Sequence, residues 1–230
     1  MSKKNIIIML FFAIFILNSC SRNNDIESSD GLPYYQFTLE EKSKLIDKPN
    51  VGTVITYKNQ DNELLKFKIF DSEIGKTTFA TGTFWGSYTT QHFHYDRQKI
   101  SMWYAEGYTY SICEINILKY PIGSNYQTQY PTVGTPRFYG YFTFPLWNGY
   151  NGTDEYNNSI SIDFDKPTIT MSFNGKTYTK VRIFESNKNI VLATTNTFPF
   201  YPKNVNIIYY DDNTGIIGFD DLNGKLWRIQ

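Results

Sequence analysis

The sequence predicts an all-β fold: an antiparallel β-sandwich or open curled barrel of about a dozen strands, with one short N-terminal helix. Apolar and polar residues alternate over 159–164 and 168–173, the period of a half-buried strand. Asn174-Gly175 comes next, and both residues tolerate the positive φ of a type I′ hairpin turn. Tyr and Phe, which favour strands, supply 19 and 18 of the 230 residues. So many strands must stack or close to hide their edges.

The first element of the chain is an apolar stretch with the features of a secretory signal. Lys3 and Lys4 form a short positive region, and a run of apolar residues follows from Ile6 to Leu17. This run is shorter than the roughly 20 residues that a membrane-spanning helix needs. It has the length of the apolar region of a signal peptide, so residues 1–19 are predicted to be removed.

The end of this stretch, Leu17-Asn18-Ser19-Cys20, resembles the lipobox of bacterial lipoprotein signal peptides. The resemblance implies that cleavage leaves Cys20 as a lipid-modified first residue carrying several acyl chains, palmitate among them. More than one chain on a single residue gives stable attachment to a membrane. The alternative is an ordinary secretory signal followed by a coincidental cysteine.

Residues 20–30 are predicted to be the lipidated cysteine and a flexible tether, because 21–30 show no apolar periodicity. Ser21 resembles the residue that sorts lipoproteins to the outer membrane, and Asp25, Glu27 and Asp30 are similar to acidic tags that direct some of them to the cell exterior. The expected location is therefore the outer membrane, on its periplasmic or cell-surface face.

Residues 31–230 are predicted to form a single β-rich domain, which begins with the short helix. Thr38-Leu39-Glu40-Glu41 fits a capping box, and the helix is expected to end near Ile46, before Pro49. The remaining segments are predicted strands, with a turn at 96–99 between two of them. They are 51–57, 64–70, 77–95, 100–106, 110–119, 137–144, 159–164, 168–173, 176–184, 190–194, 205–210, 215–219 and 225–229.

The last strands form a predicted three-stranded meander with turns at 211–215 and 220–224. This stretch resembles the C-terminal meander of small β-rich surface lipoproteins of Gram-negative bacteria. The resemblance covers about a fifth of the chain with the signal peptide included, and it implies no activity. The acidic residues of the turns lack the spacing of an EF-hand calcium loop and are ordinary turn residues.

Composition excludes several classes of function. The chain has 22 basic and 22 acidic residues, so it lacks the positive charge of a nucleic-acid-binding protein. With Cys20 lipidated, Cys113 is the one cysteine left, and its position on an apolar strand face favours an inert, buried thiol. No motif for a phosphate loop or an activated serine is present, and no cofactor is expected.

His92 and His94 are the two histidines of the chain, and they lie two residues apart on a predicted strand. Side chains at this spacing share a face, so the pair is a candidate for metal binding. Two ligands fall short of the usual three or four, and the alternative is a solvated strand face. If a turn at 96–99 pairs Tyr95 with Ile100, Trp103 shares this face and is a candidate for stacking on a sugar ring or anchoring a protein.

A second group of candidate residues lies in the predicted loop 145–158, where Trp147, Tyr150 and Tyr156 stand among Asn, Asp and Glu. Loops of this composition on rigid β scaffolds are typical of glycan-binding and adhesive surfaces. The alternative is an ordinary long turn.

The sequence therefore predicts a lipid-anchored envelope protein whose domain binds a glycan or a protein without catalysis. The alternatives are an enzyme of envelope polysaccharide metabolism and a carrier of an apolar ligand in a curled sheet.

The anchor gives the first testable prediction. Replacement Cys20→Ala removes the acceptor thiol, so the chain is expected to lose all lipid and to leave the membrane fraction. Metabolic labelling with radioactive palmitate, followed by fractionation, measures both effects. Cys113→Ala is the matched control and is expected to keep the label. Label retained by the Cys20→Ala chain would refute the anchor.

Overall fold

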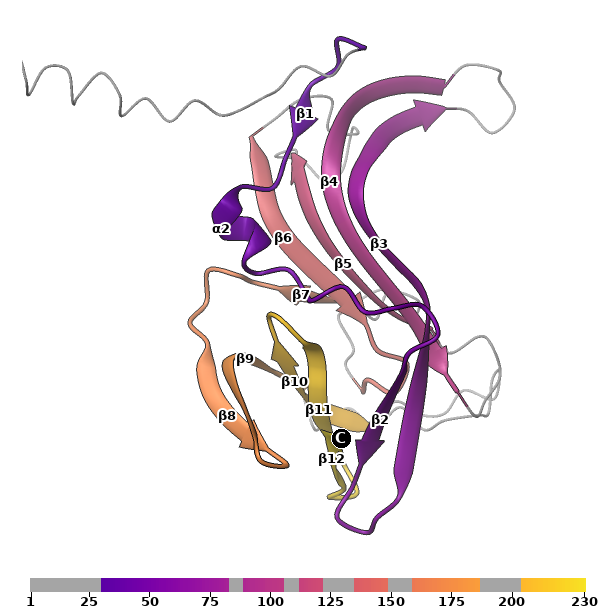
Figure 1. Ribbon diagram of the computed structural model, residues 1–230, viewed down its shortest axis with the longest axis vertical. Coiled ribbons are helices and arrows are strands. Elements are labelled where there is room, and N and C mark those ends of the chain that lie inside the picture. The colour runs from indigo at the N-terminus through magenta and orange to yellow at the C-terminus, as the bar shows by residue number, and fades with distance from the viewer. Residues whose placement is uncertain (1–29, 83–88, 106–111, 122–134, 149–158, 187–203) are drawn as a thin grey trace, which may run out of the picture.

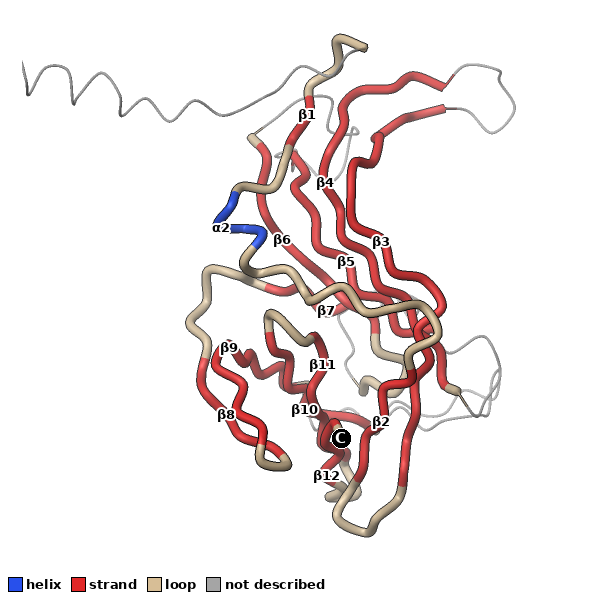
Figure 2. The backbone as a smooth tube through the Cα atoms, in the orientation of Figure 1, coloured by secondary structure: helices blue, strands red, loops and turns tan. Residues whose placement is uncertain are grey.

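The computed structural model describes residues 30–82, 89–105, 112–121, 135–148, 159–186 and 204–230, and it confirms the all-β fold (Figure 1, Figure 2). Twelve strands form one curled sheet, and β7 and β8 stand at the two ends of its strand order. Of the two predicted architectures, the open curled sheet is the one that the chain adopts. No helix in the described ranges is long and apolar enough to cross a bilayer.

The strands follow one another in the sheet in the order β7-β6-β5-β4-β3-β2-β12-β11-β10-β9-β8, and β1 lies beside β4. Neighbours in this order are antiparallel, whereas β1 runs parallel to β4. The predicted strand 190–194 lies outside the described residues. The strands are β1 (Tyr34–Tyr35), β2 (Val54–Lys58), β3 (Leu64–Gly82), β4 (Thr89–Tyr104), β5 (Ile112–Pro121), β6 (Pro136–Thr143), β7 (Ser159–Ile162), β8 (Ile169–Phe173), β9 (Lys176–Glu185), β10 (Val205–Asp211), β11 (Gly215–Asp221) and β12 (Leu226–Ile229).

The predicted turn at 96–99 is wrong, because β4 runs unbroken through these residues and pairs along its length with β3. Residues 96–99 are polar, but they include no Gly, Asn or Pro to favour a turn. Asp96 and Gln98 are buried and hydrogen-bond the backbone of the N-terminal segment. The predicted strands 77–95 and 100–106 therefore correspond to the end of β3 and to β4, and the link between them, 83–88, lies outside the described residues.

An N-terminal strap, residues 30–47, lies along the upper part of the sheet and contains the helix α2 (Leu39–Lys42) (Figure 1). The predicted capping box is confirmed, since the Glu41 amide donates to the Thr38 hydroxyl and the Thr38 amide donates to the Glu41 carboxylate. The helix ends earlier than predicted. The Gln98 side chain binds both the amide of Ile46, at 3.0 Å, and its carbonyl, at 2.6 Å, which holds that residue outside the helix.

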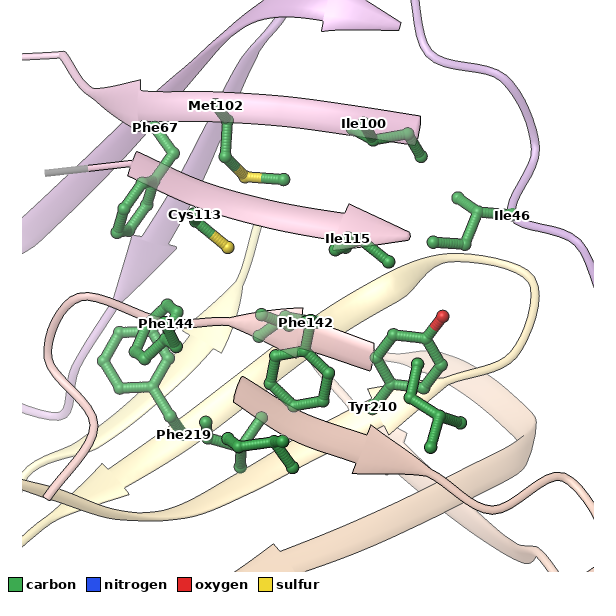
Figure 3. Packing of buried hydrophobic residues seen from close by; sticks show 14 of the residues in the cluster. Ile46, Phe67, Ile100, Met102, Cys113, Ile115, Phe142, Phe144, Tyr210 and Phe219 are labelled. Atoms are coloured by element: carbon green, nitrogen blue, oxygen red, sulfur yellow. The ribbon is translucent and has the colours of Figure 1, made fainter. Parts of the chain in front are cut away.

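The main core fills the inside of the curl, where β2 to β7 face β10 and β11. Figure 3 shows Met102 and Cys113 from β4 and β5 on one side of this core and Phe142, Tyr210 and Phe219 on the other. The rings of Phe142 and Tyr210 stack with centroids 5.6 Å apart. Cys113 is fully buried as predicted, and burial raises the pKa of its thiol far above the ordinary value. The thiol therefore stays protonated and unreactive.

The β8–β9 hairpin covers the other face of β10 and β11. The predicted turn at Asn174-Gly175 is confirmed, because both residues have positive φ, 50° and 79°, and Phe173 pairs with Lys176 across it. A second, smaller apolar cluster forms beneath the hairpin. Its members are Met171, Phe173, Tyr178, Val181, Tyr209, Ile217 and Ile229.

Arg182 on β9 joins the two ends of the curled sheet. Its guanidinium forms a buried two-point ion pair with Asp212, at 2.7 and 2.9 Å, just after β10. The same group donates to the carbonyls of Asp163, Phe164 and Lys166, which follow β7. All five N–H donors of the guanidinium are thus engaged. Arg182 thus links the β9–β10 side of the curl to the segment that follows β7.

Removal of this side chain is expected to destabilise the fold strongly. Arg182→Met leaves the Asp212 carboxylate buried without a partner, which costs about 3–5 kcal/mol of unfolding free energy. Urea denaturation measures the loss. Arg97→Met is the matched control, because its pair with Glu73 is more exposed and longer, at 3.4 Å, and is worth less than about 1 kcal/mol. Equal losses in the two variants would contradict the role given to Arg182.

Candidate functional site

The residues predicted as a site do not form one cluster. Tyr150, Tyr156 and the lipidation residue Cys20 lie outside the described residues. His92 and His94 lie in the upper part of β4, Trp103 lies at its lower end, and Trp147 follows β6. Each of these positions has its own surroundings, which decide what chemistry the side chain can perform.

His94 is buried, and each of its ring nitrogens lies 2.8 Å from a polar partner: Nδ1 from the Thr78 hydroxyl and Nε2 from the Asp30 carboxylate. A metal bound by His94 would have to displace one of these contacts. His92 is half-buried, with its ring 5.8 Å from that of Phe79. The described residues include no group of three or more His, Cys, Asp or Glu side chains placed to hold a metal.

His94 belongs to a row of buried polar side chains on β4 that binds the N-terminal strap. Asp96 accepts a hydrogen bond from the Tyr34 hydroxyl at 2.7 Å and another from the Phe37 amide at 2.8 Å. Burial, and then the Asp96 carboxylate, raise the pKa of the Tyr34 hydroxyl well above its ordinary value. The hydroxyl therefore remains a donor. Asp30, which the sequence placed in an acidic export tag, has a structural partner here in His94.

Trp103 does not share a face with His94, contrary to the prediction. Residues alternate along β4, and with no turn at 96–99 these two, nine positions apart, point to opposite sides of the sheet. For the same reason, the side chains of Phe93 and Tyr95 point to the opposite face of the sheet from that of Ile100. Trp103 is half-buried and stacks on the Phe70 ring, with centroids 4.5 Å apart and planes 14° apart.

Trp147 belongs to the main core, with 5% of its surface exposed, so the expectation that it forms an exposed binding platform is not met. Its position follows from backbone pairing: the Val205 amide donates to the Leu146 carbonyl at 2.9 Å, and the Asn148 amide donates to the Val205 carbonyl at 2.7 Å. This pairing turns the Trp147 side chain inward. Three polar residues, Asn148, Ser186 and Asn206, lie beside this pairing.

A polar junction forms where this segment meets β9 and β10, and we define it as Asn148, Ser186 and Asn206. The Ser186 amide donates to the Asn206 carbonyl at 2.9 Å, and Asn148 is bonded to the residue before Asn206. Asn148 and Asn206 are 1% and 5% exposed. The three side chains therefore start from adjacent backbone positions, and two of them are almost completely buried.

The polar junction holds hydrogen-bonding groups that are not used within the described part of the chain. In the described part of the chain, six buried side-chain polar atoms have no hydrogen-bond partner. Four of the six belong to the polar junction: Asn148 Oδ1 and Nδ2, Ser186 Oγ and Asn206 Oδ1. A buried polar atom left unpaired costs about 1–3 kcal/mol. Buried polar groups in folded proteins are paired with protein or with bound water, so unpaired groups gathered in one place call for an explanation.

One feature of the sequence indicates this junction. Asn148 lies in the loop 145–158, which was predicted to bind a ligand through its aromatic residues. In the described part of the chain, it is the side-chain amide of Asn148 that has no hydrogen-bond partner. Asn206 interrupts the apolar start of β10, where Val205 and Ile208 are both buried. Ser186 has no distinguishing pattern. The meeting of three segments so far apart in the chain could not be predicted from local spacing.

The strap contacts lead to a prediction about Asp96. Asp96→Ala removes two hydrogen bonds to a charged acceptor, so the domain is expected to lose about 1.5–3 kcal/mol of unfolding free energy. The Phe37 amide is expected to exchange its hydrogen faster, as measured by mass spectrometry. Asp165→Ala, at an exposed position, is the control and should leave both quantities unchanged. An unchanged exchange rate at Phe37 in the Asp96→Ala protein would contradict the role of Asp96.

The comparisons with known proteins identify no relative. No protein-family model matches the chain, and neither a curated protein nor a solved structure does. The chemistry of the polar junction and of the strap is therefore the basis for a functional conclusion.

Proposed function

We propose that the chain is a lipid-anchored lipoprotein of the outer membrane with a non-catalytic domain that binds a glycan or a protein. The observation that carries the binding role is the polar junction. Its four buried polar atoms without partners in the described part of the chain are a cost to the folded state that a bound ligand would offset. Side chains that served packing alone would be apolar there, as the neighbouring Trp147 and Val205 are.

The lipid anchor rests on the sequence Leu17-Asn18-Ser19-Cys20 and agrees with the position of the strap. Asp30, ten residues after Cys20, is already bound to His94 on the sheet. The tether is thus short and the domain is held close to the lipid. Ser21 supports the outer membrane, on its periplasmic or cell-surface face.

An enzyme is the weaker alternative, because the carboxylates that gather on the outer face of the sheet are already paired. Lys99 lies 3.2 Å from Asp71 and 3.5 Å from Glu114. Burial lowers the pKa of Lys99, but the two carboxylates more than offset this and raise it. The lysine remains charged between them, and Glu114 also accepts from Ser101 and Asn116. This network pairs Asp71 and Glu114 with a positive charge, so it does not favour them as the acids of a hydrolase.

Within the described residues, the cavity nearest the core does not favour a carrier of an apolar ligand. A cavity between the strap and the main core is lined by apolar side chains, Ile46, Ile100 and Met102 among them, but its volume is about 50 Å³. Pockets that hold small organic ligands measure about 300–1,000 Å³. This cavity has room for a water molecule or two and not for a lipid chain.

The test of the binding role is co-sedimentation of the purified lipoprotein with the polysaccharide and protein fractions of a Gram-negative envelope. The chain is expected to sediment with one of them, and Asn148→Ala is expected to lower the bound fraction several-fold. Assay of new reducing ends should show no release of sugar. Release that depends on this protein would favour the enzyme instead.

Ser161→Ala, on the exposed side of β7, is the matched control and is expected to bind as the parent does. Circular dichroism and urea denaturation should show that Asn148→Ala is folded, because the side-chain amide of Asn148 makes no hydrogen bond in the described part of the chain. Equal sedimentation of the parent and of Asn148→Ala would contradict a binding role for the polar junction.

A further inference from the structure

Two accessible arginines lie on the outer face of the sheet. Arg97 stands on β4 between Asp96 and Gln98, whose side chains bind the strap on the inner face. Arg137 stands on β6 beside Phe138, which packs against the main core. Because side chains alternate along a strand, both arginines point away from the core and the strap. The Arg97 side chain is 28% exposed, and Arg137 is more exposed still.

Backbone pairing places the two arginines near each other. Arg97 pairs with Leu118 on β5, and Leu118 pairs with Tyr139 on β6, two residues from Arg137. The Cα atoms of the two arginines are therefore about 10 Å apart across the strands and about 7 Å apart along them. One extended ligand that lies across β4, β5 and β6 can contact both guanidinium groups.

The two guanidinium groups keep most of their hydrogen-bonding capacity. Among the described residues, the Arg97 side chain bonds only to the exposed Glu73, through one nitrogen at 3.4 Å. The Arg137 side chain makes no ion pair or hydrogen bond in the described part of the chain. The two carboxylates beside Lys99 are neutralised by that lysine. A guanidinium has five N–H donors in a planar fork that fits an anionic group at two points, so these free donors favour an anionic ligand.

Two tyrosine rings lie on the same face as the arginines. Tyr95 lies two residues before Arg97 on β4, and Tyr141 lies two residues after Tyr139 on β6. Both rings are half-buried, and burial raises the pKa of both hydroxyls above the ordinary value. The hydroxyls therefore stay protonated and can donate a hydrogen bond. A tyrosine ring combines an apolar face with a polar tip, which matches the apolar face and the hydroxyl rim of a sugar ring.

The backbone beneath these side chains does not favour an extended peptide. At these positions β5 is paired with β4 on one side and with β6 on the other. An extended peptide binds to a sheet chiefly by adding a strand to a free backbone edge. Side chains must therefore supply the recognition here, and those available are two cationic forks and two amphipathic rings.

We infer that this arginine patch, defined as Tyr95, Arg97, Arg137 and Tyr141, binds an acidic saccharide. The guanidinium groups bind carboxylate or sulfate groups of the chain, and the tyrosine rings stack on its sugar rings. This inference rests on the proposed binding function and selects glycan over protein. It uses none of the residues of the polar junction, so the two sites can be tested separately.

Isothermal titration of the full lipoprotein, held in an uncharged detergent without a sugar headgroup, tests this ligand class. The acidic probes are hexasaccharides of galacturonate, which carries carboxylates, and of chondroitin sulfate, which carries both carboxylates and sulfates. The control probes are maltohexaose, which is neutral, and a hexapeptide of glutamate, which is anionic without sugar rings. At least one acidic saccharide is expected to bind about tenfold or more tightly than either control probe.

Arg97→Met and Arg137→Met are each expected to weaken this binding about tenfold, since each removes a charge-assisted hydrogen bond. Glu73→Gln is expected to strengthen it, because it removes the carboxylate that competes for Arg97. A purely structural role of these residues would not produce that gain. Lys42→Met, at an exposed position on α2, is the matched control and should leave binding unchanged.

Failure of both acidic saccharides to bind overturns the inference, as does equally tight binding of the glutamate peptide. Binding that neither arginine substitution alters overturns it too. If the inference fails but Asn148→Ala still lowers sedimentation with envelope fractions, the proposed binding function stands. Absence of binding by every probe, together with equal sedimentation of the parent and of Asn148→Ala, overturns both.

Discussion

The contacts of the buried Arg182 guanidinium link the two sides of the curl that enclose the main core. An open sheet of this length has two free ends, and its inner face can exclude water only if those ends stay together. The guanidinium binds one end through a carboxylate and the other through three backbone carbonyls. Burying a charge is costly unless all of its hydrogen bonds are made, and here all five are. The apolar cluster supplies the favourable free energy, while Arg182 sets the curvature at which the cluster packs.

The strap covers the upper part of the sheet, where β1 pairs with β4. Beyond Arg97 and Leu118 the structure records no further pairs between β4 and β5, and β1 lies along β4 at His94 and Tyr95. The side chains of His94, Asp96 and Gln98 then bind strap atoms, two of them backbone amides. Polar side chains on the inner face thus replace the ladder bonds that a neighbouring strand would provide. The two-residue strand β1 makes few backbone hydrogen bonds to β4. Side-chain hydrogen bonds therefore hold the rest of the strap on the sheet.

The same residues explain where prediction from sequence succeeded and failed. Alternation and turn chemistry are local, and they correctly predicted β7, β8, the Asn174-Gly175 hairpin and the C-terminal meander. On β4, Asp96 and Gln98 place polar residues between two apolar stretches, so one long strand was divided by a predicted turn and Trp103 was assigned to the wrong face. Their partners lie about fifty or more residues earlier in the chain, where no local pattern can indicate them. The polar junction could not be predicted for the same reason, because its three residues come from segments that are far apart in the chain.

The docking of the strap at Asp30 has a consequence for affinity. If Cys20 carries the lipid as proposed, ten residues separate the acyl chains from the sheet, and a polypeptide of that length spans at most roughly 35 Å. The domain is then confined to a thin layer beside the membrane and does not diffuse through the whole compartment. For a partner fixed in the same layer, tethers of this kind give effective concentrations in the millimolar range. A site built from a few neutral hydrogen bonds can be weak in solution and still be occupied where the protein resides.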